Sequence, residues 1–245
     1  MKRFEAVLFD LGSTLIYFDS DWPAVMPQAD LALLRSLEDS GLALAETKFL
    51  TNYELRLQEY YAQRETEFLE YTTTFILQTL LAELGHPNVA DAVLRKAVEA
   101  MYAVTQAHWQ TEADAASTLE LLQQRGYRLG IISNAGDDQD VQTLVDKARL
   151  RPYFDVIVTS AAQGIRKPNP RIFHTALQAL GGIPPGSALM VGDTLGADIL
   201  GARNAGMSNA WITRRADTPA NRAHQDTIQP DLTIAALGEL LEILE

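Results

Sequence analysis

Short apolar runs alternate with amphipathic segments throughout residues 113–245. The runs have the length of buried strands, and the segments between them carry apolar residues at helical spacing. The predicted strands are residues 129–132, 156–159, 188–191 and 210–213, and the predicted helices are residues 115–124, 140–148, 171–180, 197–205 and 234–244. Strands that alternate with helices favour right-handed crossovers and a doubly wound parallel sheet. The pattern therefore predicts an α/β fold.

A block of helical character interrupts this alternation after the first predicted strand, residues 4–11. Its helical segments are residues 29–37, 47–63, 68–84 and 89–102. We expect an all-helical cap domain over residues 17–112, inserted into a core domain formed by residues 1–16 and 113–245. Because sheets of this kind bind ligands at the carboxyl ends of their strands, the cap should cover the ligand edge.

The charge of the chain restricts its partners. The 245 residues carry a formal net charge of −12 and include no cysteine. The average field therefore repels nucleic acid and anionic membranes, and thiolate chemistry is excluded. No apolar run reaches membrane-spanning length. We expect a cytoplasmic protein, a monomer or a homodimer, that acts on a small molecule.

Polar side chains follow four of the predicted strands, where a parallel sheet brings them to one edge. They are Asp10, Ser133 with Asn134, Lys167, and Asp193 with Asp198. Each alone has an ordinary explanation as a helix cap, a turn former or a solvated loop residue. Together they offer carboxylates for Mg²⁺, an ammonium and a hydroxyl for phosphate, and an aspartate that can attack phosphorus.

Four segments carry a resemblance to a known family. FDLGSTL, IISNA, GIRKPNPRIF and MVGDTLGADILGA, in this order, resemble the four motifs of the haloacid dehalogenase-like (HAD) hydrolase superfamily. The resemblance spans the whole chain and implies a Rossmann-like core with an inserted cap. It also implies a Mg²⁺-dependent phosphatase that forms an aspartyl phosphate.

The resemblance assigns a role to each residue of the set. Asp10 would be the nucleophile, Lys167 would stabilise charge, and Ser133, Asn134 and Lys167 would bind the phosphoryl group. Asp10, Asp193 and the carbonyl of Gly12 would bind Mg²⁺. Thr14 and Asp198 would support these ligands.

The first motif departs from the phosphatase pattern at Gly12. Phosphatases of the family commonly carry an aspartate there, which protonates the leaving group and later activates water. Loss of such a group typically costs about 10²- to 10⁴-fold in rate. Asp19 or Asp21 could replace it only if the cap linker folds back. We therefore expect substrates whose leaving groups need little protonation, such as sugar 1-phosphates and acyl phosphates.

Three alternatives stay open. A haloacid dehalogenase would attack carbon without a metal, although its usual first-motif tyrosine is missing here. A phosphonate hydrolase would need a Schiff-base lysine in the cap, for which Lys48 and Lys96 are candidates. A catalytically impaired relative could serve as a binding or regulatory protein.

Overall fold

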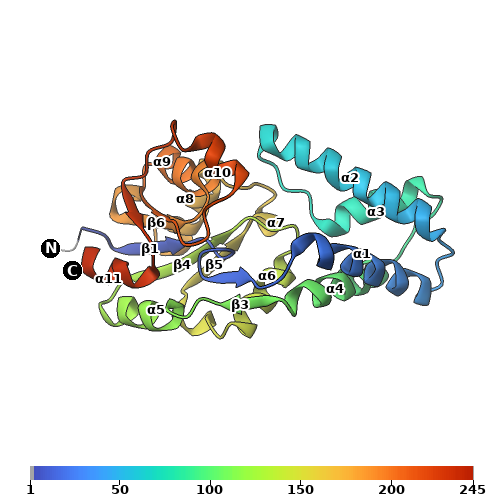
Figure 1. The fold of residues 1–245 in the computed structure, drawn as a ribbon, viewed down its shortest axis with the longest axis horizontal. Coiled ribbons are helices and arrows are strands. Elements are labelled where there is room, and N and C mark those ends of the chain that lie inside the picture. The colour runs from blue at the N-terminus through green and yellow to red at the C-terminus, as the bar shows by residue number, and fades with distance from the viewer. Residues whose placement is uncertain (1–2, 245) are drawn as a thin grey trace.

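The computed structural model describes residues 3–244, which form a six-stranded parallel sheet with helices on both faces and a separate group of helices beyond one end (Figure 1). The helices are α1 (Trp22–Asp39), α2 (Glu46–Glu67), α3 (Thr73–Glu83), α4 (Asp91–Gln106), α5 (Ala115–Gln124), α6 (Asp138–Lys147), α7 (Ser160–Gln163), α8 (Pro170–Ala179), α9 (Leu200–Asn204), α10 (Pro219–His224) and α11 (Leu240–Ile243). The strands are β1 (Ala6–Phe9), β2 (Ile16–Phe18), β3 (Trp109–Thr111), β4 (Arg128–Ser133), β5 (Val156–Thr159), β6 (Ala188–Gly192), β7 (Ser208–Ile212) and β8 (Leu232–Ile234).

The sheet has the order β5-β4-β1-β6-β7-β8, and every neighbouring pair is parallel. Strand β1 lies inside the sheet, and all four of its side chains are fully buried. Val7 and Phe9 point into the hydrophobic core on one face, which includes residues of α5, α6 and α11. Ala6 and Leu8 point into the core on the other face, which includes residues of α8 and α9. An uninterrupted apolar run is what a strand covered on both faces requires.

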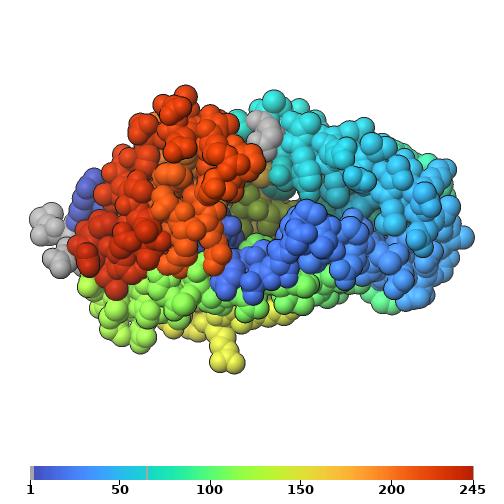
Figure 2. All heavy atoms as spheres, viewed as in Figure 1, coloured from blue at the N-terminus to red at the C-terminus, as the bar shows by residue number. Residues whose placement is uncertain are grey.

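Helices α1 to α4 form what we call the helical unit, which has a hydrophobic core of its own drawn from residues 29–104. In Figure 1 the strands of the sheet point toward this unit. Figure 2 shows a hollow between helix α2 of the unit, coloured cyan, and the orange and red C-terminal part of the chain. The expectation of a helical block beyond the carboxyl ends of the strands agrees with this arrangement.

Several predicted element boundaries were wrong. Residues 16–18 and 109–111 form the antiparallel pair β2–β3 that connects the helical unit to the rest of the chain, so residues 17–112 are not entirely helical. Helix α3 begins at Thr73, not at residue 68. Phe68 has a left-handed backbone that ends α2, and the Thr72 side chain caps α3 by accepting from the Phe75 amide.

The C-terminal segment also differs from its prediction. Residues 232–234 add β8, which was not predicted, to the edge of the sheet beside β7. The helix expected over residues 234–244 begins later, as a 3₁₀ turn at Leu237–Glu239 followed by α11. A three-residue strand is too short to show an alternating pattern. Within residues 3–244, none of the helices combines the length and apolar character needed to cross a lipid bilayer.

Candidate active site

Three of the predicted site residues lie at the carboxyl ends of adjacent strands. Asp10 follows β1, Ser133 ends β4, and Asp193 follows β6. The register pairs Phe9 with Ile131 on one side and with Val191 on the other, so these strands end almost level. All three polar side chains are buried. The sheet places Asp10 beside strands whose site residues are more than 100 positions away from it in the sequence.

Lys167 joins this group from the loop between α7 and α8. Its side chain is 2% exposed, and Nζ donates to Asp10 Oδ1 at 2.5 Å, Asp198 Oδ1 at 2.6 Å and the Ile132 carbonyl at 2.8 Å. Burial alone would lower the pKa of Lys167, but the two carboxylates outweigh it and raise the pKa above its usual value. The lysine is therefore a permanent buried cation.

Asn134 holds the loop that carries this lysine. Its side-chain amide donates to the Lys167 carbonyl at 3.0 Å, and its side-chain oxygen accepts from the Lys167 backbone N–H at 2.9 Å. Both polar groups of the side chain thus have partners within the protein. Asn134 thus holds the backbone of Lys167, and its contact with substrate stays a prediction.

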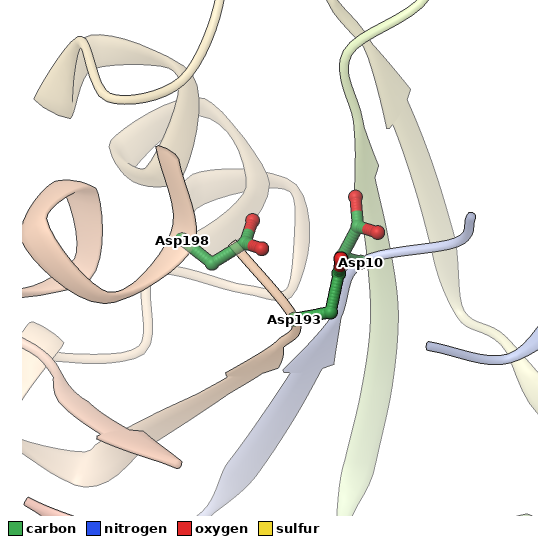
Figure 3. A group of neighbouring side chains, drawn as sticks. All are labelled: Asp10, Asp193 and Asp198. Carbon is green, nitrogen blue, oxygen red and sulfur yellow. The ribbon is translucent and has the colours of Figure 1, made fainter. Parts of the chain in front are cut away.

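Asp10, Asp193 and Asp198 form a buried acidic cluster (Figure 3). Ligand oxygens from the three side chains lie within 4.8 Å of one another. Burial raises the pKa of Asp10 to about 6, with Lys167 opposing the shift and Asp198 adding to it. Burial and the charges of Asp10 and Asp198 raise the pKa of Asp193 to about 8.

The donor set of this cluster fits a hard divalent cation. Lys167 pairs with Asp10 and Asp198 and leaves Asp193 without an ion pair, so the three carboxylates and one lysine keep two uncompensated negative charges when all three acids are ionised. Mg²⁺ binds oxygen ligands and usually takes only one or two carboxylates, keeping water or phosphate oxygens in its other positions. Asp10 and Asp193 could supply those carboxylates while Asp198 stays bonded to Lys167.

The Asp198 side chain is held against the backbone of the turn that follows β6. Its Oδ2 accepts from the Thr194 backbone N–H at 2.9 Å, within the turn that follows β6. A Cβ atom at Gly192 would lie 2.3 Å from Cγ of Asp198, well inside any tolerable contact distance. Glycine at position 192 is therefore required for Asp198 to reach Lys167.

Two residues that the sequence analysis missed hold the backbone of Asp193. Trp211 Nε1 and Asn221 Nδ2 each donate to the Asp193 carbonyl at 2.8 Å. Asn221 also accepts from the Leu195 backbone N–H at 2.8 Å. These contacts join segments 18 and 28 residues from Asp193, and no local motif indicates them.

The turn after β1 places Gly12 beside the indole of Trp109. A Cβ atom at Gly12 would meet Cη2 of Trp109 at 3.4 Å, an ordinary van der Waals distance. Trp109 packs edge to face against Phe18, with ring centroids 5.5 Å apart. Thr14 is fully buried, and its hydroxyl has no hydrogen-bond partner among the described residues.

Other candidate residues lie outside this group. Lys48 and Lys96 are exposed on α2 and α4, so neither has the desolvated surroundings that activate a Schiff-base lysine. Asp19 and Asp21, considered as replacement acids, are exposed.

Comparison with known proteins agrees with the geometry of the site. Residues 4–206 match the model of a family described as haloacid dehalogenase-like hydrolase. A glyceraldehyde 3-phosphate phosphatase from Methanothermobacter thermautotrophicus is 33% identical over 98% of this chain and 99% of its own length. A HAD phosphatase from Thermococcus onnurineus superposes with a TM-score of 0.65, at 27% identity and 98% coverage of both chains. A 2-haloacid dehalogenase from Pseudomonas syringae superposes with a TM-score of 0.67, at 26% identity and 98% coverage of both chains.

Proposed function

The chain belongs to the haloacid dehalogenase-like hydrolases, and from this premise we propose that it is a Mg²⁺-dependent phosphatase of a small phosphorylated metabolite. The observation that carries the proposal is a cluster of three buried carboxylates in which one lysine, Lys167, pairs with Asp10 and Asp198. Such a site has acidic side chains in excess and accepts both a divalent cation and the phosphate that the cation attracts.

Asp10 is the proposed nucleophile. With a pKa of about 6 it is mostly ionised at neutral pH, even before a cation lowers the value further. One carboxylate oxygen attacks phosphorus while the bond to the leaving oxygen breaks, and water later displaces the phosphoryl group from Asp10. Lys167, which contacts Asp10 directly, opposes the build-up of negative charge and holds the carboxylate in place.

The proposed Mg²⁺ ligands are Asp10, Asp193 and the backbone carbonyl of Gly12. The ion, when bound, supplies the positive charge that lets an anionic carboxylate approach an anionic phosphoryl group. Thr14 and Asp198 support these residues, and Ser133 binds the phosphoryl oxygens.

Two observations lead to different substrates. The similarity to a protein named glyceraldehyde 3-phosphate phosphatase supports a three-carbon phosphate ester. The glycine at position 12 instead favours leaving groups that depart without a proton, as in sugar 1-phosphates and acyl phosphates. A panel with both kinds of substrate separates them, because the second hypothesis fails if turnover is independent of leaving-group basicity.

The proposal is tested by phosphate release with and without Mg²⁺, in the wild type and in Asp10→Asn. We expect metal-dependent turnover that Asp10→Asn abolishes. Undiminished turnover by this variant would remove Asp10 as the nucleophile. Halide release from 2-haloacids, measured on the same preparations, tests the dehalogenase alternative. Absence of turnover on the whole panel would favour the impaired relative.

A further inference from the structure

The connection between α2 and α3 contacts residues 164–166, in the part of the chain that carries the six-stranded sheet. This contact is remote in sequence from β2 and β3, which connect the helical unit to that part. Leu69 and Ile165 form an isolated antiparallel bridge. Beside it, the Glu70 N–H donates to the Gly164 carbonyl at 3.1 Å and the Arg166 N–H donates to the Phe68 carbonyl at 3.0 Å. The helical unit thus pairs with the segment that immediately precedes Lys167.

Glu70 inserts a carboxylate into this contact. Its side chain is 1% exposed, and Oε2 accepts from Ser160 Oγ at 2.7 Å and lies 3.3 Å from Arg166 Nη1. Oε1 accepts from the Tyr60 hydroxyl. A buried carboxylate is tolerated only when such partners replace water. Ser160 and Arg166 lie outside the helical unit, so moving the unit away would remove both of them and leave Glu70 the Tyr60 hydroxyl of its own unit.

Both core partners lead to the phosphoryl-binding residues. Ser160 Oγ accepts from the Ala135 backbone N–H at 2.9 Å, and Ala135 follows Ser133 and Asn134. Arg166 precedes Lys167, whose backbone is held on both sides by the Asn134 side chain. The Glu70 carboxylate therefore contacts Ser160, which bonds to the segment after Ser133, and Arg166, which directly precedes Lys167. These are the two segments that would hold the phosphoryl group.

We propose that Glu70 is a positioning residue that makes the phosphoryl-binding geometry depend on docking of the helical unit. With the unit docked, Glu70 orients the Ser160 hydroxyl and the Arg166 side chain, and through them fixes Ala135 and Lys167. When the unit moves away, the link is broken and these segments relax. The inference rests on the proposed phosphatase function, because only a phosphoryl ligand needs both segments together.

Glu70→Gln tests the link, because the variant keeps the size of the side chain but removes its charge. Glu83→Gln is the matched control, since Glu83 also pairs with an arginine, but this arginine, Arg56, lies within the helical unit and the pair is exposed. We expect Glu70→Gln to lose at least about tenfold in kcat/KM at a temperature where it is fully folded, and to bind inorganic phosphate more weakly. The control should stay within about twofold of the wild type.

Amide hydrogen exchange supplies a readout that needs no turnover. We expect faster exchange of the Ala135 amide in Glu70→Gln than in Glu83→Gln, with unchanged exchange in β1. Ser160→Ala should show the same two effects, and combining it with Glu70→Gln should add little, because both remove one link.

The outcomes separate the two proposals. Glu70 does not position the site if kcat/KM of Glu70→Gln matches that of Glu83→Gln. The same conclusion follows if the losses of Glu70→Gln and Ser160→Ala add fully in the double variant. Either result decides the question, whatever the exchange data show. If the wild type lacks phosphatase activity, the proposed function fails, and unchanged phosphate binding and Ala135 exchange would then overturn the link as well. Should Glu70→Gln not fold, Ser160→Ala carries the same test.

Discussion

Protons and Mg²⁺ should compete for the acidic cluster, and this competition gives the stability of the protein an unusual pH dependence. An unfolded aspartate titrates near pH 3.9. In the folded, metal-free protein the pKa is about 6 for Asp10 and about 8 for Asp193. At pH values between the unfolded pKa of about 3.9 and these folded-state values, Asp10 and Asp193 keep protons in the folded protein that the unfolded chain has released. The stability that these bound protons contribute is therefore complete below pH 4 and is lost as pH rises toward 8.

The expected magnitude follows from these pKa values. Each extra proton held by the folded state lowers stability by about 1.4 kcal/mol per pH unit. Asp193 stays largely protonated from pH 5 to 7 and Asp10 loses its proton in this range, so the two together account for a loss on the order of 4 kcal/mol. For a chain of 245 residues this corresponds to roughly 8 to 16 °C in Tm. Mg²⁺ should restore stability more at pH 8 than at pH 5.5 because it binds the ionised acids.

Thermal unfolding of metal-free wild type and Asp193→Asn, each with and without Mg²⁺, measures this effect. The other carboxylates are common to both proteins, so the difference between their pH profiles isolates position 193. We expect Asp193→Asn to gain stability over the wild type as pH rises to 8 and to respond little to Mg²⁺. Parallel pH profiles of the two metal-free proteins, or an equal Mg²⁺ shift at both pH values in the wild type, would refute the reasoning.

Three further predictions concern the residues around the cluster. Lys167→Met should lower the unfolding free energy by about 3–5 kcal/mol in urea titrations at pH 8, because it leaves Asp10 and Asp198 buried without their cation; a loss below about 1 kcal/mol would mean that the acids protonate at little cost. Gly192→Ala should lose most activity and measurable stability, since its Cβ would lie 2.3 Å from Asp198 Cγ, and wild-type kinetics in this variant would contradict the tight approach. Gly12→Asp should fold, because a Cβ fits there at 3.4 Å, and should accelerate basic leaving groups by about 10²-fold or more relative to good ones; an equal change for all substrates would show that position 12 does not supply a proton.

The sequence was sufficient to predict five of the six strands of the sheet, all except β8, and the meeting of Asp10 and Asp193 at the carboxyl ends of their strands. Asp10 and Asp193 each end a buried apolar run, and parallel strands necessarily end at one edge, so their convergence follows from the pattern alone. The same reasoning could not find Trp211 and Asn221. They act on a backbone carbonyl through side chains from distant segments, and nothing in the local sequence records such a contact.

The role of Asn134 illustrates a second limit. Its position beside Ser133 predicts a contact with substrate, yet the structure shows both polar groups of its side chain bonded to the Lys167 backbone. The contact of Asn134 with substrate stays a prediction, whereas its contact with the Lys167 backbone depends on how the loop after α7 folds and could not be predicted. Glu70 was missed for a related reason, because periodicity within a helical block does not show which polar residue faces the core.

The stereochemical course at phosphorus tests the central claim most directly. A substrate that the wild type hydrolyses is prepared as a chiral thiophosphate ester with one non-bridging oxygen labelled with ¹⁸O. It is hydrolysed in water enriched in ¹⁷O, and the configuration of the inorganic thiophosphate product is determined. Attack by Asp10 followed by attack of water makes two in-line displacements, each of which inverts phosphorus. The account therefore predicts net retention of configuration. Net inversion would mean that water attacks the substrate directly and that Asp10 is not the nucleophile.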